Sequence, residues 1–177
     1  MNYMNTKNKK EYHPTDIEIE QAVALIYYEI KQLIDSTLLS QDVKDIRFKN
    51  AFVESVLVHT RILIEFFENE RRWKDDVLTS DFGFSPKKLN ISDHDRDRLN
   101  KDLAHLTYSR LNRSHEEKNW DYINVVLPIL IRASEYIKFL LNEYLVPKKP
   151  YFFQFKQLLD DINKIIIVNT SDELSES

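Results

Sequence analysis

Gly83 is the single glycine in this chain of 177 residues. Phosphate-binding loops and dinucleotide-binding fingerprints need several glycines at fixed spacing, because only glycine lets the backbone approach a phosphate closely. Sheet-rich folds need many tight turns, and one glycine with five prolines is a poor supply of turn residues. The sequence therefore excludes P-loop and Rossmann chemistry and favours a helical fold.

The stretch from Asn50 to Phe67 carries the most regular apolar pattern in the chain. Residues at steps of three or four share one face of a helix. One such face carries Phe52, Val56, His59, Leu63 and Phe66, and a second carries Val53, Leu57 and Ile64. A helix that is apolar nearly all round is a buried helix. We therefore predict a helix from about Lys44 to Asn69, preceded by a polar break at residues 40–43 and covered by the other helices.

Four further helices follow from the same periodicity and from capping signals, among them the pairs Thr15 with Glu18, Ser92 with Asp95, and Ser114 with Glu117. They are predicted over residues 15–39, 92–111, 114–145 and 151–166. Pro128 lies inside the fourth, so we expect a kink there or a helix that begins anew. The expected fold class is all-α: one domain, a mainly antiparallel bundle of about five helices with a buried central second helix.

The ends of the chain are polar, so we expect a disordered arm over residues 1–14, a helical domain over residues 15–167 and a disordered acidic tail over residues 168–177. With 42% hydrophobic and 31% charged residues, the composition is that of a globular protein. No apolar run is long enough for a signal peptide or a membrane span. We therefore expect a cytoplasmic protein with no membrane partner.

Between residues 70 and 91 the helical periodicity fails, and a connection of this length in a compact domain tends to be functional or mobile. Asp75, Asp76 and Asp81 lie in this loop. Three aspartates can bind a hard cation, but they lack the glycine and the ligand alternation of a calcium loop. The alternative is that they are solvated or capping carboxylates.

The predicted third helix carries the densest polar set, with Arg98, Asp102, His105 and Ser109 along one edge. Arg98 and His105 are seven residues apart, so they point to the same side of a helix about 10.5 Å apart along its axis. A histidine can transfer a proton near neutral pH and an arginine can hold a phosphate with two hydrogen bonds, which together suit metal-independent cleavage of a phosphodiester. The alternative is a surface ladder of alternating charge.

The run from Arg98 to Tyr108, with six residues between Arg98 and His105 and the string LAHLTY, resembles the arginine-to-histidine motif of the HEPN superfamily. That resemblance implies a small helical bundle and a homodimer. It also implies a composite ribonuclease site in which His105 is the general acid/base and Arg98 the phosphate ligand, within toxin–antitoxin or phage-defence systems. RNA is the implied substrate.

The strings LVHTRILIEFFE, DDVLTSDF and LAHLTYSR also resemble segments of an uncharacterised bacterial family of small helical proteins. This resemblance implies no activity. It groups six polar residues that we would test together, namely His59, Arg61, Asp75, Asp76, His105 and Arg110.

Two polar residues interrupt the central helix. His59 is either a core histidine bonded to a carbonyl or carboxylate, or an imidazole that opens onto a pocket. Arg61 is about 200° from His59 around the helix, so the two cannot serve one site unless the helix bends.

We expect no metal and no cofactor. The chain has no cysteine and no HExxH pattern. Asp102 and His105 form a single carboxylate-x-x-histidine pair, whereas a di-metal helical bundle needs two. A non-enzymatic alternative remains. The aromatic segment YFFQF and the loop around Trp73 would then form a docking surface for another copy or another protein, because aromatic residues dominate interface energetics.

Overall fold

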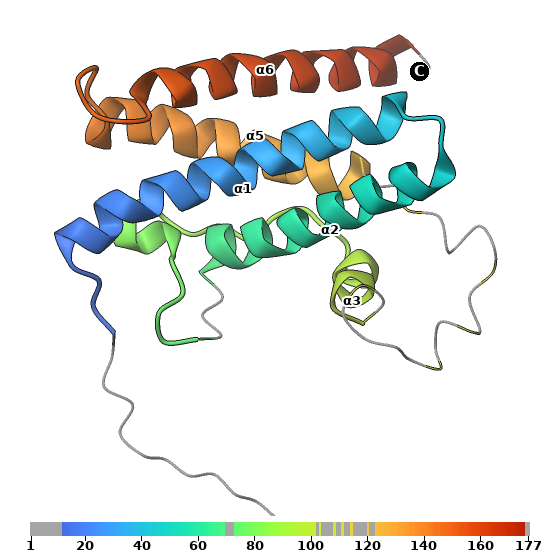
Figure 1. Cartoon of the computed structure of the whole chain (residues 1–177), viewed down its shortest axis with the longest axis horizontal. Coiled ribbons are helices and arrows are strands. Elements are labelled where there is room, and N and C mark those ends of the chain that lie inside the picture. The colour runs from blue at the N-terminus through green and yellow to red at the C-terminus, as the bar shows by residue number, and fades with distance from the viewer. Residues whose placement is uncertain are drawn as a thin grey trace, which may run out of the picture.

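The computed structural model describes residues 12–69, 73–101, 103, 108, 111, 114, 120 and 123–175, with side chains described up to residue 167. The described part is helical, as the sequence predicts, and Figure 1 shows its arrangement. The elements are α1 (Asp16–Asp42), α2 (Ile46–Glu68), the 3-10 helix η1 (Thr79–Phe82), α3 (Asp93–Lys101), α5 (Ile123–Phe139), the π-helical turn η3 (Leu140–Tyr144) and α6 (Phe152–Ser175).

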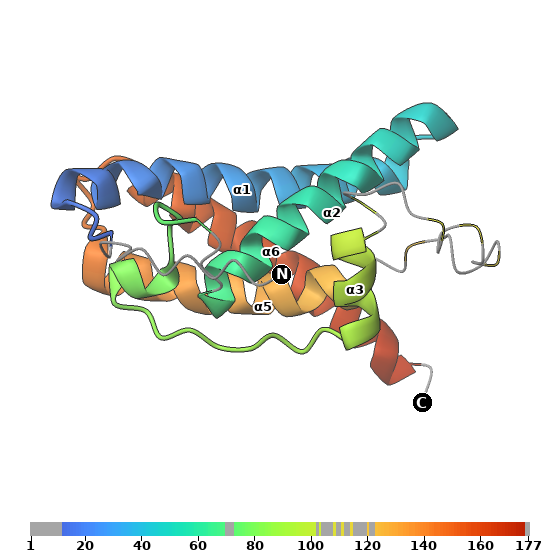
Figure 2. The same ribbon diagram turned by 90° about the horizontal axis from the view of Figure 1, so that it is seen from below.

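Two antiparallel helical hairpins make up the bundle (Figures 1 and 2). One is formed by α1 and α2, the other by α5 and α6, and α2 packs on α5 where the two hairpins meet. The helix α3 lies across the bundle below α2, and the segment from η1 to α3 runs along the edge beside α5. The mainly antiparallel bundle predicted from the sequence is thereby confirmed.

The helix α1 begins where the sequence predicts. Thr15 is its N-cap and forms a capping box with Glu18, in which each side chain accepts a hydrogen bond from the other residue's backbone. The end of α1 is later than predicted, because the helix continues to Asp42 and Ser40 is buried within it. The break lies at residues 43–45, where Asp45 caps α2 through the backbone N–H of Arg47.

The two predicted apolar faces of α2 are covered. Val56, Leu57 and Leu63 are at most 2% exposed, and they pack against α1 and α5. The covering is incomplete, because Val58 and Ile62 lie between these faces and remain 42% and 40% exposed. A helix that is apolar nearly all round therefore has one open side in this bundle.

The third and fourth helices differ in extent from the prediction. The helix α3 ends at Lys101 instead of Leu111, and Tyr108 and Leu111 have 3-10 geometry. The helix α5 begins at Ile123 instead of Ser114, so Trp120 precedes it and Pro128 lies inside it. Both extents were predicted from periodicity and capping, which report local preference only. Most residues between Lys101 and Ile123 lie outside the described part of the chain.

The last helix is longer than predicted. It begins at Phe152 and buries Phe155, Leu158 and Ile162, which are three or four residues apart. It continues to Ser175 and so includes most of the segment predicted as a disordered tail. Before it, a backbone bond from the N–H of Leu145 to the carbonyl of Leu140 closes the π-helical turn that ends α5.

The centre of the core is aromatic. The ring of Tyr136 on α5 is fully buried, with ring centroids of neighbours between 5.2 and 6.5 Å away. These neighbours come from α2, η1, the following loop and α5, and they are Phe66, Phe67, Phe82, Phe84 and Phe139. Gly83 ends η1 with φ 78°, a left-handed conformation that favours glycine.

In the described part of the chain, no helix is long and apolar enough to cross a membrane.

Candidate functional site

Of the predicted catalytic pair, the structure describes one member. Arg98 is 6% exposed, and its Cζ lies 3.9 Å from the ring centroid of Trp120. This cation–π contact holds the guanidinium on α3 against the aromatic ring. Outside the described residues lie His105, Asp102, Ser109 and Arg110. A ribonuclease site formed by Arg98 and His105 therefore stays a prediction.

His59 is bonded to a carboxylate, as one of the two interpretations predicts. Its Nδ1 lies 2.6 Å from Oε2 of Glu29 on α1, and its ring packs edge-on against Tyr28 with 5.9 Å between centroids. The His59 side chain is 11% exposed and that of Glu29 is 22% exposed. The pair thus bridges α1 and α2 at the border between core and solvent.

Arg61 and Asp76 also have identifiable contacts. The Nε of Arg61 lies 3.4 Å from Oε1 of Glu65, one helical turn further along α2. Asp76 accepts the backbone N–H of Trp73 at 2.7 Å, which is the capping role expected for a loop carboxylate. Asp75 is exposed beside it.

These polar groups meet around one pocket of about 320 Å³ between α1, α2 and the loop that precedes η1. Its lining combines apolar side chains with four acidic residues, Glu29, Glu65, Asp75 and Asp76. The described lining includes no lysine or arginine. Although His59 and Arg61 project to different sides of α2, as predicted, their partners Glu29 and Glu65 line the same pocket.

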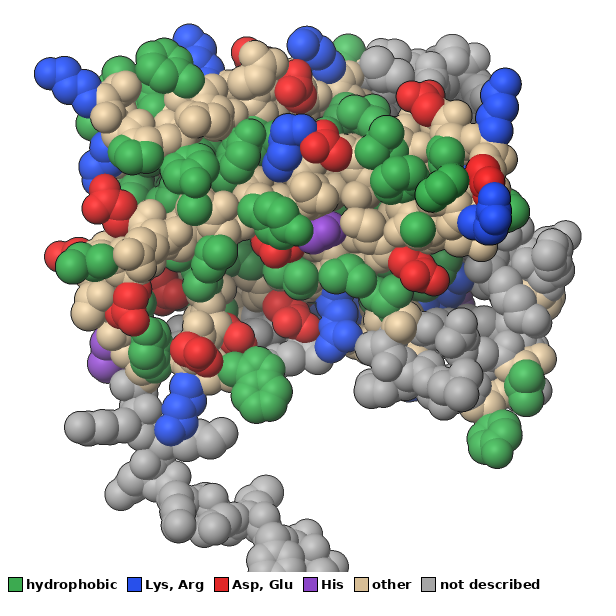
Figure 3. All heavy atoms as spheres, in the orientation of Figure 1, with side chains coloured by type: hydrophobic (Ala, Val, Ile, Leu, Met, Phe, Trp, Pro, Cys, Tyr) green, Lys and Arg blue, Asp and Glu red, His purple; other side chains and the backbone are tan. Residues whose placement is uncertain are grey.

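The pocket opens onto an exposed apolar surface, the α1/α2 face, which we define by Leu25, Tyr28, Val58 and Ile62. Their exposed fractions are 60%, 53%, 42% and 40%. Leu25 and Ile62 also line the pocket, and Val58 is one helical turn from Ile62. Hydrophobic side chains gather over α1 and α2 on this side of the molecule (Figure 3).

Further carboxylates lie next to this pocket. A smaller hollow of about 50 Å³ shares Asp75 and Asp76 with it and adds Glu18 and Asp81. A hydrogen bond from Tyr12 and two from Thr15 lower the pKa of Glu18 to about 2, so this carboxylate is ionised at neutral pH. The hydrogen bond to Glu18 raises the pKa of Tyr12 most, and the charges of Asp75 and Asp81 add to that shift. Four acidic residues therefore line this hollow.

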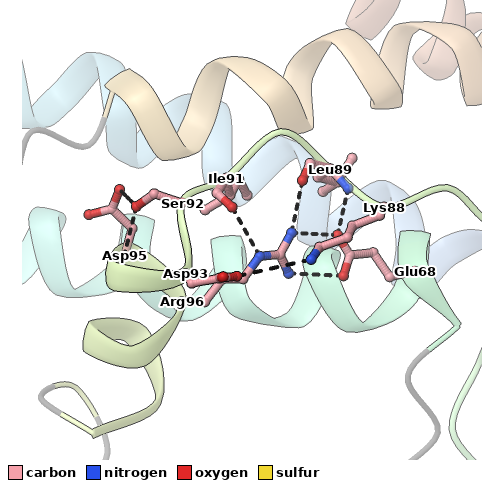
Figure 4. A network of polar contacts seen from close by, with 8 residues as sticks. All are labelled: Glu68, Lys88, Leu89, Ile91, Ser92, Asp93, Asp95 and Arg96. Carbon is pink, nitrogen blue, oxygen red and sulfur yellow. Dashed lines mark hydrogen bonds and ion pairs between the residues drawn. The ribbon is translucent and has the colours of Figure 1, made fainter.

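A second polar cluster joins α2 to α3 and is rich in hydrogen bonds (Figure 4). Arg96 forms two hydrogen bonds with Glu68, of 2.7 and 2.9 Å. Its Nε–H donates to the carbonyl of Ile91 and its Nη2 also donates to the carbonyl of Leu89, while Glu68 accepts the N–H of Leu89 at 2.6 Å. Four of the five N–H groups of the Arg96 guanidinium are thereby hydrogen-bonded, so the cluster holds α3 on α2.

A cleft of about 680 Å³ lies between α5 and residues 87–95. Arg132 lines it and is held by Glu135, by the carbonyl of Ser85 and by the ring of Phe84, whose centroid is 4.1 Å from its Cζ. The cleft carries both signs of charge, with Lys87 and Lys88 opposite the carboxylates of Asp95 and Glu135. Arg132 therefore holds the loop on α5.

Sequence reasoning missed Glu29 and Glu65 as well as the α1/α2 face. The available signal was a further apolar pattern, since Val58 and Ile62 are four residues apart on a helix whose other faces were already apolar.

No protein-family model, curated protein or solved structure matches this chain. Within the described residues, no three His, Asp or Glu side chains converge closely enough to ligate a metal ion.

Proposed function

We propose that this chain is a non-enzymatic docking protein, and that the α1/α2 face binds an amphipathic helical segment of another protein. The observation that carries the proposal is that Leu25, Tyr28, Val58 and Ile62 are all exposed on the α1–α2 hairpin, where Leu25 and Ile62 also line a pocket. Single exposed apolar residues are normal on a protein surface. A contiguous apolar patch with a polar rim is typical of an interaction site.

Two packed antiparallel helices present a shallow apolar surface, and an amphipathic helix binds such a surface through side chains three and four residues apart. Burying apolar area stabilises a complex by about 25 cal/mol per Å² removed from water. The core of this domain is built by other residues, such as Leu57 and Tyr136. The exposed positions are therefore available for docking without loss of the fold.

The proposal is tested by selection from a displayed library of helical peptides whose side chains are randomised at a fixed register. Wild-type protein is the target, and a Leu25→Ser/Ile62→Ser variant is used for counter-selection. We expect enriched peptides to carry an apolar stripe and to bind the double variant at least about tenfold more weakly, because two buried contacts are lost.

The matched control is Phe153→Ser on α6, which removes a side chain that is 68% exposed away from the α1/α2 face. Selected peptides should bind this control as tightly as the wild type. Circular dichroism confirms that all variants remain helical. Peptides that bind the Leu25→Ser/Ile62→Ser variant and the wild type equally well would overturn the proposal.

The ribonuclease alternative rests on the spacing of Arg98 and His105 and on the HEPN resemblance. Its test is cleavage of mixed single-stranded and structured RNA in EDTA by the wild type and by His105→Ala. Cleavage by the wild type alone would support an RNA-cleaving enzyme with His105 as its acid/base. Absence of cleavage, or equal cleavage by both, would remove His105 as the catalyst.

A further inference from the structure

The cleft between α5 and residues 87–95 has one wall made of extended chain and one made of helix. We propose that an extended segment of another protein binds in this cleft and pairs with the main chain of Lys88 as an added β-strand. The cleft holds about 680 Å³, within the range of about 300–1,000 Å³ that is common for ligand sites. The site is separate from the α1/α2 face, and the inference does not depend on the function proposed for that face.

The extended wall of the cleft is bound to α2 along one side. The N–H of Lys87 donates to the carbonyl of Phe67 at 3.1 Å, and the N–H of Leu89 donates to Glu68 at 2.6 Å (Figure 4). The carbonyl of Leu89 accepts a hydrogen bond from Arg96 at 2.9 Å. Because two alternate residues direct their N–H groups to the same helix, and no helix or turn is formed here, the chain is extended.

Lys88 lies between these two residues and has the opposite orientation. In an extended chain, the main-chain groups of successive residues point to opposite sides. Those of Lys88 therefore point away from α2 and towards the cleft, which Lys88 lines. Among the described residues, neither its N–H nor its carbonyl has a hydrogen-bond partner. Lys88 thus presents one donor and one acceptor, as a residue on the open edge of a sheet does.

Pro86 continues this edge. It is two residues before Lys88, so its main chain lies on the same side of an extended segment. Prolines in strands are found on edges, where the missing N–H interrupts no ladder. Its carbonyl has no hydrogen-bond partner in the described part of the chain, which adds a second acceptor.

This pattern of donor and acceptors selects an extended peptide as the occupant. In strand addition, main-chain hydrogen bonds give the affinity and contacts of alternate side chains give the specificity. The α5 wall of the cleft supplies Leu127, Pro128 and Ile131, and Ile131 is 43% exposed. The partner segment is therefore expected to have apolar side chains at alternate positions.

A second copy of this chain is a poor occupant. Two-fold antiparallel pairing about Lys88 places the two Lys88 side chains opposite each other, and like charges directly opposite across a strand pair are destabilising. The Nζ of Lys88 lies 4.0 Å from Asp93, and both side chains are largely exposed, at 75% and 95%. Lys88 can therefore turn to a carboxylate on another chain. The partner is expected to carry an acidic residue opposite Lys88.

The inference is tested by selection from a displayed library of short linear peptides of random sequence. Wild-type protein is the target, and Lys88→Pro, which deletes the N–H on the cleft side, is used for counter-selection. The matched control at the same position is Lys88→Ala, which keeps the N–H and removes the charge. Fluorescence anisotropy measures a labelled synthetic copy of the most enriched peptide against each variant, and circular dichroism compares their helicity.

We expect Lys88→Pro to weaken binding at least about tenfold, because main-chain hydrogen bonds are lost. Lys88→Ala should weaken it only about threefold, because one cross-strand charge pair is lost. The Leu25→Ser/Ile62→Ser variant should bind the peptide as tightly as the wild type. This inference and the function proposed for the α1/α2 face therefore fail independently.

A second measurement leaves the protein unchanged. The main-chain nitrogens of the peptide are methylated one at a time, which removes one donor from each analogue. Binding should fall at least about tenfold at alternate positions, because only every second N–H of a paired strand faces its neighbour. This measurement decides the inference if Lys88→Pro lowers the helicity.

Three results would overturn the inference. The first is a selection that enriches no peptide. The second is equal binding to the wild type and to a Lys88→Pro variant of unchanged helicity. The third is a methylation series without alternation, which would mean that the peptide does not bind as a strand.

Discussion

Glu68 and Glu29 both lie on the α1–α2 hairpin and both pair with a basic side chain, but their surroundings differ. Glu68 is 7% exposed, and Arg96 meets it with two hydrogen bonds while also donating to two backbone carbonyls. Glu29 is 22% exposed and meets His59 through one contact at the edge of a pocket. The Glu68–Arg96 pair, with its additional backbone hydrogen bonds, holds α2 and α3 together. The Glu29–His59 pair lies beside a pocket and contributes charge to a surface that another molecule can reach.

The largest expected effect follows from this comparison. Glu68→Gln should lower the free energy of unfolding by about 3 kcal/mol, because it leaves the buried guanidinium of Arg96 without its counter-charge. Glu29→Gln should cost less than about 1 kcal/mol, because its pair is partly solvated. Urea denaturation of both variants measures the difference. Equal losses would show that the two pairs have the same structural role.

A double variant sharpens the same comparison. Replacing both partners with apolar residues, as in Glu68→Leu/Arg96→Met, should cost less than Glu68→Gln alone, because no buried charge is left without a partner. If the double variant is less stable than Glu68→Gln, the hydrogen bonds from Arg96 to backbone carbonyls contribute more to the free energy of unfolding than its ion pair with Glu68.

A change of opposite sign is expected at Tyr136. Its hydroxyl is buried and has no hydrogen-bond partner among the described residues, and burial raises its pKa well above the ordinary value. Tyr136→Phe removes a polar group that is not satisfied and should stabilise the fold by about 1 kcal/mol. Thermal denaturation measures this gain. A loss of stability would show that the hydroxyl contributes a favourable contact.

Glu18 provides an exposed carboxylate for comparison. Its pKa is lowered from 4.5 to about 2, and the hydrogen bond from Tyr12 is the largest cause. Because the folded pKa is depressed, its stabilisation of the start of α1 is present above pH 4.5 and is lost as the pH falls through 2. An NMR titration of the Glu18 carboxyl should show a midpoint near 2, and Tyr12→Phe should move it towards 4.5. A wild-type midpoint near 4.5 would contradict the hydrogen-bond arrangement.

The smallest effect on stability is expected on the α1/α2 face. Leu25→Ser/Ile62→Ser should change the free energy of unfolding by no more than about 0.5 kcal/mol, because both side chains are exposed. Urea denaturation measures this change. A loss of several kcal/mol would show that these side chains belong to the core and would remove the reason to treat the face as a docking surface.

Parts of the site were predictable from the sequence. The capping role of Asp76 and the carboxylate partner of His59 were each one of two stated interpretations, and both are confirmed. The identity of that partner was not predictable, since Glu29 and His59 are far apart in the sequence and meet only when α1 packs against α2. The polar set around Arg98 was proposed from spacing, and the stacking of Arg98 on Trp120 was not anticipated.

The sequence by itself determined the all-α class, the capping box at Thr15 and the buried stripes of α2. These features depend on capping and periodicity, which act over a few neighbouring residues. The tertiary structure alone decided the pairing of Glu68 with Arg96 and which apolar side of α2 stays exposed. These features depend on how two hairpins pack, and a helix that is apolar on three sides does not specify which side its neighbours leave open.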